Sequence, residues 1–355
     1  MTAAILLAAA ICNAEVCPER TNDFCWENDK FGMRAYGPGD YHKWSGWDVF
    51  NKAADAGTTC CHLLHNPGKC GKWHDNPFKG ILDNYTMGAS RGVGGVAFWG
   101  DGEWKTYSNW ESAKVIRTDD ECCEFELVYP AFAAPGKMTC HVTLRRGERF
   151  FRCDVSFEHP DRFQSDFRAG PGIDLEPKRD HKGVLVEEPG LVSLFEDPKG
   201  ANGSTMEAIF VADAADVEVM TDRMNCRVLA FKKPRFTYWA GAAWSKAEEI
   251  TTPEAWIAAV RAFRQEKSIA PLALCRANGF VPKSEYLDLV DALPSAAYFR
   301  TRPAKPEVDP PRGAPRLLAG DQGAGPARRA PGRAVFVKAP KGKTHRFRTI
   351  LRPVK

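Results

Sequence analysis

The stretch CEFELVY, residues 123–129, alternates apolar and polar side chains with a period of two. Because successive side chains of a β-strand point to opposite faces, this pattern is typical of a half-buried antiparallel strand. The same alternation recurs at residues 138–144 and 150–157, and the connections carry the turn signals Pro135-Gly136 and Arg146-Gly147-Glu148. The three segments therefore predict half-buried antiparallel strands.

Further strand-like segments extend the pattern in both directions, at residues 31–36, 92–99, 191–195, 206–212, 217–220, 226–231 and 235–239. About ten strands at this spacing favour a mainly β, antiparallel sandwich, since two sheets can bury facing apolar sides without crossover helices. One amphipathic helix is expected near the C-terminal edge, capped by Thr252 and continuing through Lys267. A weaker helix is expected at residues 284–293.

Three parts are predicted along the 355 residues. Residues 1–14 are typical of a signal peptide with cleavage after Ala14, which predicts an exported protein of the periplasm or the extracellular space. A mis-assigned start is the alternative. Residues 15–300 form the sandwich, and residues 301–355 form a disordered basic tail rich in Pro and Gly. The tail is read either as a segment that binds an acidic polymer or as an out-of-frame end.

The net charge of +4 is distributed unevenly. Residues 302–355 carry 14 Lys and Arg against 3 Asp and Glu, which leaves 35 against 42 in the rest of the chain. The folded part is therefore acidic, and no nucleic-acid partner is expected. No apolar run after the N-terminal segment reaches the roughly 18–20 residues that span a bilayer, so no membrane span is expected. The sequence predicts no oligomeric state.

Twelve cysteines include the adjacent pair Cys60-Cys61. Export would permit disulfides. The chain has no C-x-x-C pair, which disfavours a structural zinc site. Cys123, Cys140 and Cys153 lie in strand-like runs and are expected to be small buried core residues. No metal or cofactor is predicted; the alternative is a divalent cation held by Glu27, Asp29, Asp48 and Asp83.

The densest mixture of aromatic and polar side chains lies between residues 26 and 95. Aromatic faces stack on sugar rings, while carboxylates, amides and guanidinium groups bind hydroxyl or acid groups. This mixture favours a carbohydrate-binding groove, and the alternative is that the aromatic residues belong to the core. The predicted substrate-binding residues are Trp26, Glu27, Asn28, Asp48, Trp73, Asp83 and Ser90.

The spaced motifs of this region resemble those of a known family. They include Arg20, Trp26-Glu27-Asn28-Asp29, Arg34, Tyr36-Gly37-Pro38, His74, Asp83, Tyr85, Ser90-Arg91-Gly92 and Tyr238-Trp239-Ala240-Gly241. Over about residues 17–275 the chain is similar to the bacterial domain-of-unknown-function family 4861. The resemblance implies a secreted protein that accompanies pectin- and uronide-degrading enzymes, with a galactose-mutarotase-like supersandwich fold.

Two features depart from the family pattern. Trp73 stands where the family usually has a tyrosine, and Val93 replaces a usual glycine, which leaves the subsite geometry open. The insertion that contains Cys60-Cys61 and Cys70 looks peculiar to this chain.

Elimination at a uronic acid needs a group that neutralises the carboxylate, a base for the C5 proton and an acid for the leaving oxygen. We expect Arg91 to bind the carboxylate, His74 to act as the base and Tyr85 to act as the acid. The predicted function is therefore a lyase acting on uronic-acid-containing oligo- or polysaccharides.

Alternative functions remain open. Mutarotation or epimerisation needs a histidine acid and a carboxylate base, and glycoside hydrolysis needs two carboxylates. For the former, the candidates are Glu176, Glu207 and Asp83 as bases, with His159 or His181 as acids. A non-catalytic carbohydrate-binding protein is the third class. Convergence of His74, Tyr85 and Arg91 on one cleft would favour catalysis over binding.

Overall fold

The computed structural model describes residues 11–40, 46–100, 102–106, 109–131, 136–163, 166–175, 183–222, 226–247, 249–278, 335–338, 344–347 and 350–353. The chain forms two compact units, residues 1–270 with 349–355, and residues 271–348. Within the described ranges, no helix has the length and apolar character needed to cross a bilayer. The weaker helix expected at residues 284–293 lies outside the described residues.

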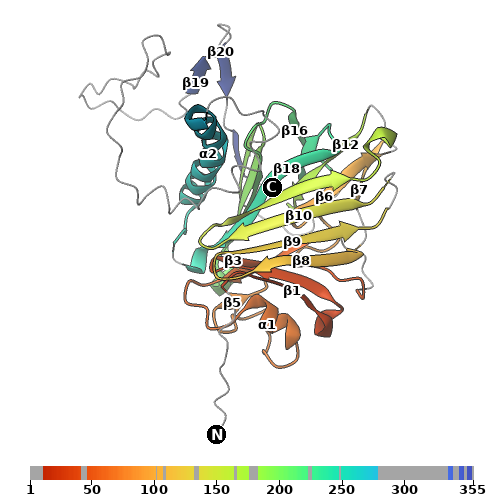
Figure 1. Cartoon of the computed structure of the whole chain (residues 1–355). Coiled ribbons are helices and arrows are strands. Elements are labelled where there is room, and N and C mark those ends of the chain that lie inside the picture. The colour runs from red at the N-terminus through yellow and green to blue at the C-terminus, as the bar shows by residue number, and fades with distance from the viewer. Residues whose placement is uncertain are drawn as a thin grey trace, which may run out of the picture. The chain divides into compact units, whose positions relative to one another are not determined.

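A nine-stranded antiparallel sheet dominates the first unit (Figure 1). Its strands, in spatial order, are β21 (Ile350–Pro353), β13 (Gly183–Glu188), β14 (Leu191–Glu196), β15 (Thr205–Phe210), β18 (Arg235–Trp244), β11 (Phe150–Phe157), β10 (Met138–Arg145), β9 (Cys122–Tyr129) and β8 (Ser112–Thr118). In β10, buried residues alternate with half-buried ones along the whole strand, as period-two patterning predicts. The prediction of a mainly β, antiparallel protein is confirmed.

Two five-stranded sheets complete the β structure of this unit. One of them, the first sheet along the chain, contains β1 (Asn13–Cys17), β2 (Asp23–Glu27), β3 (Phe31–Ala35), β4 (Trp47–Lys52) and β5 (Ile81–Leu82). The other contains, in spatial order, β16 (Val217–Thr221), β17 (Arg227–Phe231), β12 (Arg168–Ile173), β6 (Val93–Gly100) and β7 (Glu103–Thr106). The predicted segments do not include β2 or β4, in which every residue is buried.

One apolar core joins all three sheets, as the sandwich prediction requires. Phe125 of β9, Val96 of β6 and Met33 of β3 belong to the same buried cluster. Two buried hydrogen bonds link the layers: the Trp47 indole donates to the Tyr129 hydroxyl at 2.8 Å, and the Tyr238 hydroxyl donates to the Gly94 carbonyl at 2.6 Å. Gly94 has a φ of +90°, and a Cβ there would lie 2.8 Å from the Ala240 Cβ, so the close contact requires glycine.

The helix α2 (Pro253–Asn278) begins where the sequence predicts it. The Thr252 hydroxyl accepts a hydrogen bond from the Ala255 amide at 3.2 Å, as an N-cap residue does. Trp256 and Val260 are buried in a second apolar cluster with Phe150 of β11 and Phe210 of β15. The apolar face of this amphipathic helix therefore covers part of the nine-stranded sheet.

A short helix that the sequence does not predict, α1 (Cys60–His65), lies in the insertion between β4 and β5. The Thr59 hydroxyl caps it by accepting from the His62 amide at 3.0 Å. The eleven cysteines from Cys12 to Cys226 are all buried, and none of them is in a disulfide. The prediction that Cys123, Cys140 and Cys153 are core residues is confirmed.

The N-terminal boundary of the sandwich differs from the prediction. Cys12 is buried, and its amide donates to the Asp119 carbonyl at 3.1 Å. Ala14 pairs with Trp26 inside the first sheet, so cleavage after Ala14 would cut β1. Export of the protein stays a prediction.

Three short strands lie within residues 301–355, the region predicted as a disordered tail. Strands β19 (Val335–Lys338) and β20 (Thr344–Phe347) pair with each other in the second unit. Strand β21 pairs with β13 in the first unit. Because β21 is only four residues long, sequence periodicity gives no signal for it. The rest of this region lies outside the described residues.

Candidate active site

A cavity of about 710 Å³ opens beside the first sheet. Fourteen of its sixteen lining residues carry hydrogen-bonding side chains. They come from the end of the 3-10 turn at Pro18–Arg20, from β3 and the segment that follows it, from β4, from the segment 74–88 and from the segment after β14. The lining residues are Arg20, Thr21, Arg34, Tyr36, Asp40, Asp48, His74, Asp75, Asp83, Asn84, Tyr85, Thr86, Met87, Gly88, Lys199 and Asn202. Such a lining suits a small polar ligand.

Arg34 is the central cation of this cavity. It lies opposite Asp48 in the antiparallel register of β3 and β4, and its guanidinium donates to the Asp48 carboxylate. The same group lies 3.3 Å from an Asp83 carboxylate oxygen and 3.0 Å from the Tyr36 hydroxyl. Asp23 lies at 3.9 Å. A single buried guanidinium therefore faces three buried carboxylates.

The electrostatics of this cluster favour proton exchange at Asp48. Burial, together with the neighbouring charge of Asp83, raises the pKa of Asp48 to about 6, against the opposing effect of Arg34. The Tyr36 hydroxyl donates to the same Asp48 oxygen at 3.0 Å. Burial also raises the pKa of Tyr36, which keeps that phenol protonated. Asp48 is therefore a carboxyl group that can gain or lose a proton near neutral pH.

His74 is an exposed titratable group of the cavity. Its Nδ1 lies 3.1 Å from an Asp83 carboxylate oxygen, and its ring stacks on Trp73 with centroids 4.0 Å apart. Trp73 in turn stacks on Phe50 of β4. The hydrogen bond to Asp83 raises the pKa of His74 above its usual value, and about half of the side chain is exposed. Asp83 and Trp73 thus orient an imidazole whose Nε2 is left for a ligand.

Replacing Asp83 by asparagine is expected to lower the pKa of the His74 imidazole. The substitution removes the carboxylate that stabilises the charged ring, which is the main cause of the raised pKa. Side-chain ¹H–¹⁵N NMR of His74 across a pH titration measures the change. The matched control is Asp75→Asn, since Asp75 lines the same cavity. An unchanged His74 pKa in Asp83→Asn would show that Asp83 does not control this group.

The predicted catalytic residues only partly converge. His74 and Tyr85 line the cavity, whereas Arg91 does not. The Arg91 guanidinium is buried and binds Asp222, with Nη2 at 2.9 Å and Nε at 3.1 Å. Its predicted role as the carboxylate-binding group of this cavity is therefore corrected, because an internal ion pair holds it in the core.

Tyr85 presents its ring rather than its hydroxyl group. The hydroxyl oxygen is buried and has no hydrogen-bond partner among the described residues. Burial and the neighbouring charge of Glu207 raise the pKa of the phenol well above its usual value. The Lys199 ammonium lies 5.8 Å from the ring centroid. This placement does not suit the predicted role of proton donor to a ligand in the cavity.

Of the predicted substrate-binding residues, Asp48 and Asp83 line the cavity. The others are buried and serve the fold, so their predicted contact with a ligand is corrected. Trp26 lies in the core, and Glu27 binds Lys52 at 2.7 Å. Asn28 donates to the carbonyls of Arg145 and Glu148, Trp73 supports His74, and Ser90 donates to the Met87 carbonyl.

The residues of the mutarotase alternative do not converge on this cavity either. Glu207 is fully buried, and His159 begins an exposed turn. Glu176 and His181 lie outside the described residues. Asp83 is the one member of that set that lines the cavity.

Several lining residues were missed as functional candidates, above all Arg34, Tyr36, Lys199 and Asn202. Arg34 carries the clearest available signal, since it is a charged residue in a short apolar strand. Arg20 also lines the cavity, and its Nε is buried without a hydrogen-bond partner among the described residues.

The fold and the cavity define a β-sandwich protein with a polar cavity lined by titratable groups. The chain belongs to the family described as "Domain of unknown function (DUF4861)", whose model matches residues 8–271. This result confirms the resemblance noted in the sequence. The chain is also similar to "Uncharacterized protein P7" of Formosa agariphila, with 27% identity over 284 residues that cover 74% of this chain and 69% of that protein.

Solved structures show a weaker likeness. The galactosidase domain of an alpha-galactosidase–sucrose kinase aligns with 9% identity and a TM-score of 0.36, over 65% of this chain and 42% of that one. A GH36 alpha-galactosidase of Geobacillus stearothermophilus aligns with 8% identity and a TM-score of 0.38, over 66% and 42%. The chain thus spans about two fifths of the length of these structures. TM-scores at this level carry no argument about activity.

Proposed function

We propose that this protein is a carbohydrate-active enzyme that transfers protons at a saccharide bound in the cavity. One observation carries the proposal: His74, oriented by Asp83, shares a polar cavity with Asp48, whose pKa is raised to about 6. An imidazole and a carboxyl group that both exchange protons near neutral pH are the pair that general acid–base catalysis requires. The polar lining supports a ligand rich in hydroxyl groups.

Within this class we propose β-elimination on a uronide. His74 Nε2 would take the C5 proton, the C4–O bond would break as the C4–C5 double bond forms, and the Asp48 carboxyl would protonate the leaving oxygen. The role first assigned to Arg91 passes to Arg20. Its cationic side chain lines the cavity and has a buried Nε that can donate to a carboxylate.

The test is incubation of the purified protein with a panel of uronate-containing and neutral oligosaccharides. Elimination leaves the summed mass of the products unchanged and creates an unsaturated uronide that absorbs in the ultraviolet. Hydrolysis adds one water, and NMR of a freshly dissolved anomer detects mutarotation.

Elimination products support the full proposal. Mutarotation alone supports proton transfer but contradicts the lyase assignment. Hydrolysis products contradict the proposed β-elimination. Binding without any reaction contradicts both assignments and identifies a non-catalytic sugar-binding protein.

A further inference from the structure

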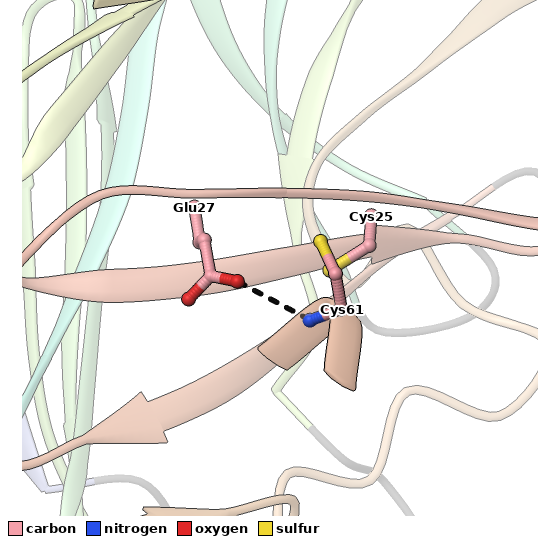
Figure 2. A group of neighbouring side chains, drawn as sticks. All are labelled: Cys25, Glu27 and Cys61. Carbon is pink, nitrogen blue, oxygen red and sulfur yellow. Dashed lines mark hydrogen bonds between the residues drawn. The ribbon is translucent and has the colours of Figure 1, made fainter. Parts of the chain in front are cut away.

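A second cluster of reactive side chains lies apart from the cavity lining. Cys25 and Glu27 are on β2, Cys61 is in α1, and their sulfur and oxygen atoms all lie within 4.8 Å of one another (Figure 2). All three residues are buried. Cys25 and Glu27 are two positions apart on one strand, so they share the face that α1 covers. Figure 2 shows the thiols of Cys25 and Cys61 side by side, with the Glu27 carboxylate beside them.

A fourth possible donor lies next to this group. The Cys61 thiol makes side-chain hydrogen bonds with the thiols of both Cys17 and Cys25. Cys17 is on β1, which pairs with β2 in antiparallel register. Cys17 is therefore a neighbour of Cys61, while the three atoms that lie within 4.8 Å of one another come from β2 and α1.

The charges around this point suit a bound dication. The Lys52 ammonium lies 2.7 Å from Glu27 Oε2, and the Cys61 amide donates to Glu27 Oε1 at 3.2 Å. A dication with the thiolates of Cys17, Cys25 and Cys61, the Glu27 carboxylate and the Lys52 ammonium leaves a net charge of about −1, against about −3 for the same deprotonated groups without the ion. The reduction matters because unpaired charge is costly at a buried site.

We propose that Cys17, Cys25, Cys61 and Glu27 form a binding site for one Zn²⁺ ion. Zinc in proteins is bound tetrahedrally, at about 2.3 Å from sulfur and 2.0–2.2 Å from oxygen, which places ligand atoms roughly 3.5–3.8 Å apart. The observed spacing of up to 4.8 Å among the donor atoms of Cys25, Glu27 and Cys61 needs only a small contraction, and Cys17 would join them from its position beside Cys61. Thiolate ligands select a soft or borderline metal rather than calcium or magnesium. The missing C-x-x-C pair does not count against this site, because its ligands come from three separate elements.

The ion would fasten the insertion that carries α1 onto the first sheet. Cys17, Cys25 and Cys61 belong to one buried cluster with Phe50, Trp73 and Ile81. Trp73 is the residue on which His74 stacks. Zinc would therefore stabilise the buried part of the segment that carries His74. Its role would be structural rather than catalytic.

The test measures metal content and metal spectroscopy on the full chain purified under reducing conditions with zinc supplied. We expect about one Zn²⁺ per chain in the wild type and in Cys70→Ala, and less than about a tenth of that in Cys25→Ser/Cys61→Ser. Cys70 is the matched control, since it is buried in the same cluster and lies outside the ligand group. Equal zinc in the wild type and the double variant would overturn the proposal.

Cobalt provides a readout that needs no variant. Co²⁺ bound to the wild-type protein should show thiolate-to-cobalt charge-transfer absorption and the intense visible bands of a tetrahedral site, and Zn²⁺ should displace it. Failure of the reduced wild type to bind either ion overturns the proposal, even if the double variant does not fold. A Cys25–Cys61 disulfide found by mass spectrometry in protein prepared with zinc also overturns it.

Discussion

Replacing His74 by alanine is expected to lower turnover of the saccharide by about two to four orders of magnitude, the usual contribution of a positioned general base. The free energy of unfolding should change little. The side chain is half-exposed, and Asp83 keeps its contact with Arg34 at 3.3 Å when the imidazole is lost. Initial rates on a substrate identified from the oligosaccharide panel, with urea denaturation of the same preparation, measure the two effects.

The matched control for this prediction is His62→Ala. His62 is exposed in α1 and does not line the cavity, so its loss should leave turnover unchanged. Asp83→Asn should give an intermediate loss, because the imidazole remains but loses the group that orients it. A His74→Ala variant that kept more than about a tenth of the wild-type turnover would remove His74 from the mechanism.

Some strands follow directly from sequence because one face of the strand is more buried than the other. β9 and β10 show this alternation clearly and appear where it predicts them. Every residue of β2 and β4 is buried, and the resulting patterns DFCWE and WDVFNK contain no alternation. Such strands are defined by tertiary packing, which sequence periodicity does not record.

The same reasoning explains which site residues could be predicted. His74 and Asp83 belong to one polar segment, and their composition suggests a site. The sequence does not show whether the side chain of Arg34 or that of Arg91 reaches the cavity. Both residues are buried, so the direction of each side chain is set by the fold. Arg34 faces Asp48 across a strand pair, while Arg91 faces Asp222, which lies 131 positions away. Trp26 is predicted to bind a sugar because aromatic residues often stack on sugar rings. In the structure it packs against Trp47 and Phe125 in the core.

Arg34 is expected to make a large contribution to stability. Its guanidinium is buried among the carboxylates of Asp23, Asp48 and Asp83. Breaking a buried ion pair by removing one partner costs about 3–5 kcal/mol, because the other partner stays buried without its counter-charge. Exposed ion pairs contribute about 1 kcal/mol or less. The pair formed by Arg117 and Asp119, both exposed, therefore provides a matched control.

Replacing Arg34 by methionine is accordingly expected to lower the free energy of unfolding by about 3–5 kcal/mol near pH 7.5, whereas Arg117→Met should cost less than about 1 kcal/mol.

The stability loss caused by Arg34→Met should shrink at acidic pH. Asp48 already has a folded-state pKa of about 6, above its unfolded value, so the folded state binds its proton more tightly and protonation favours folding. Removing Arg34 takes away a charge that lowers this pKa, and the variant should recover stability as the pH falls from about 7 towards 5. Urea denaturation of both variants and the wild type at the two ends of this range measures the effect. A cost for Arg34→Met that equals that of Arg117→Met, or that grows on acidification, would show that the three carboxylates do not depend on Arg34.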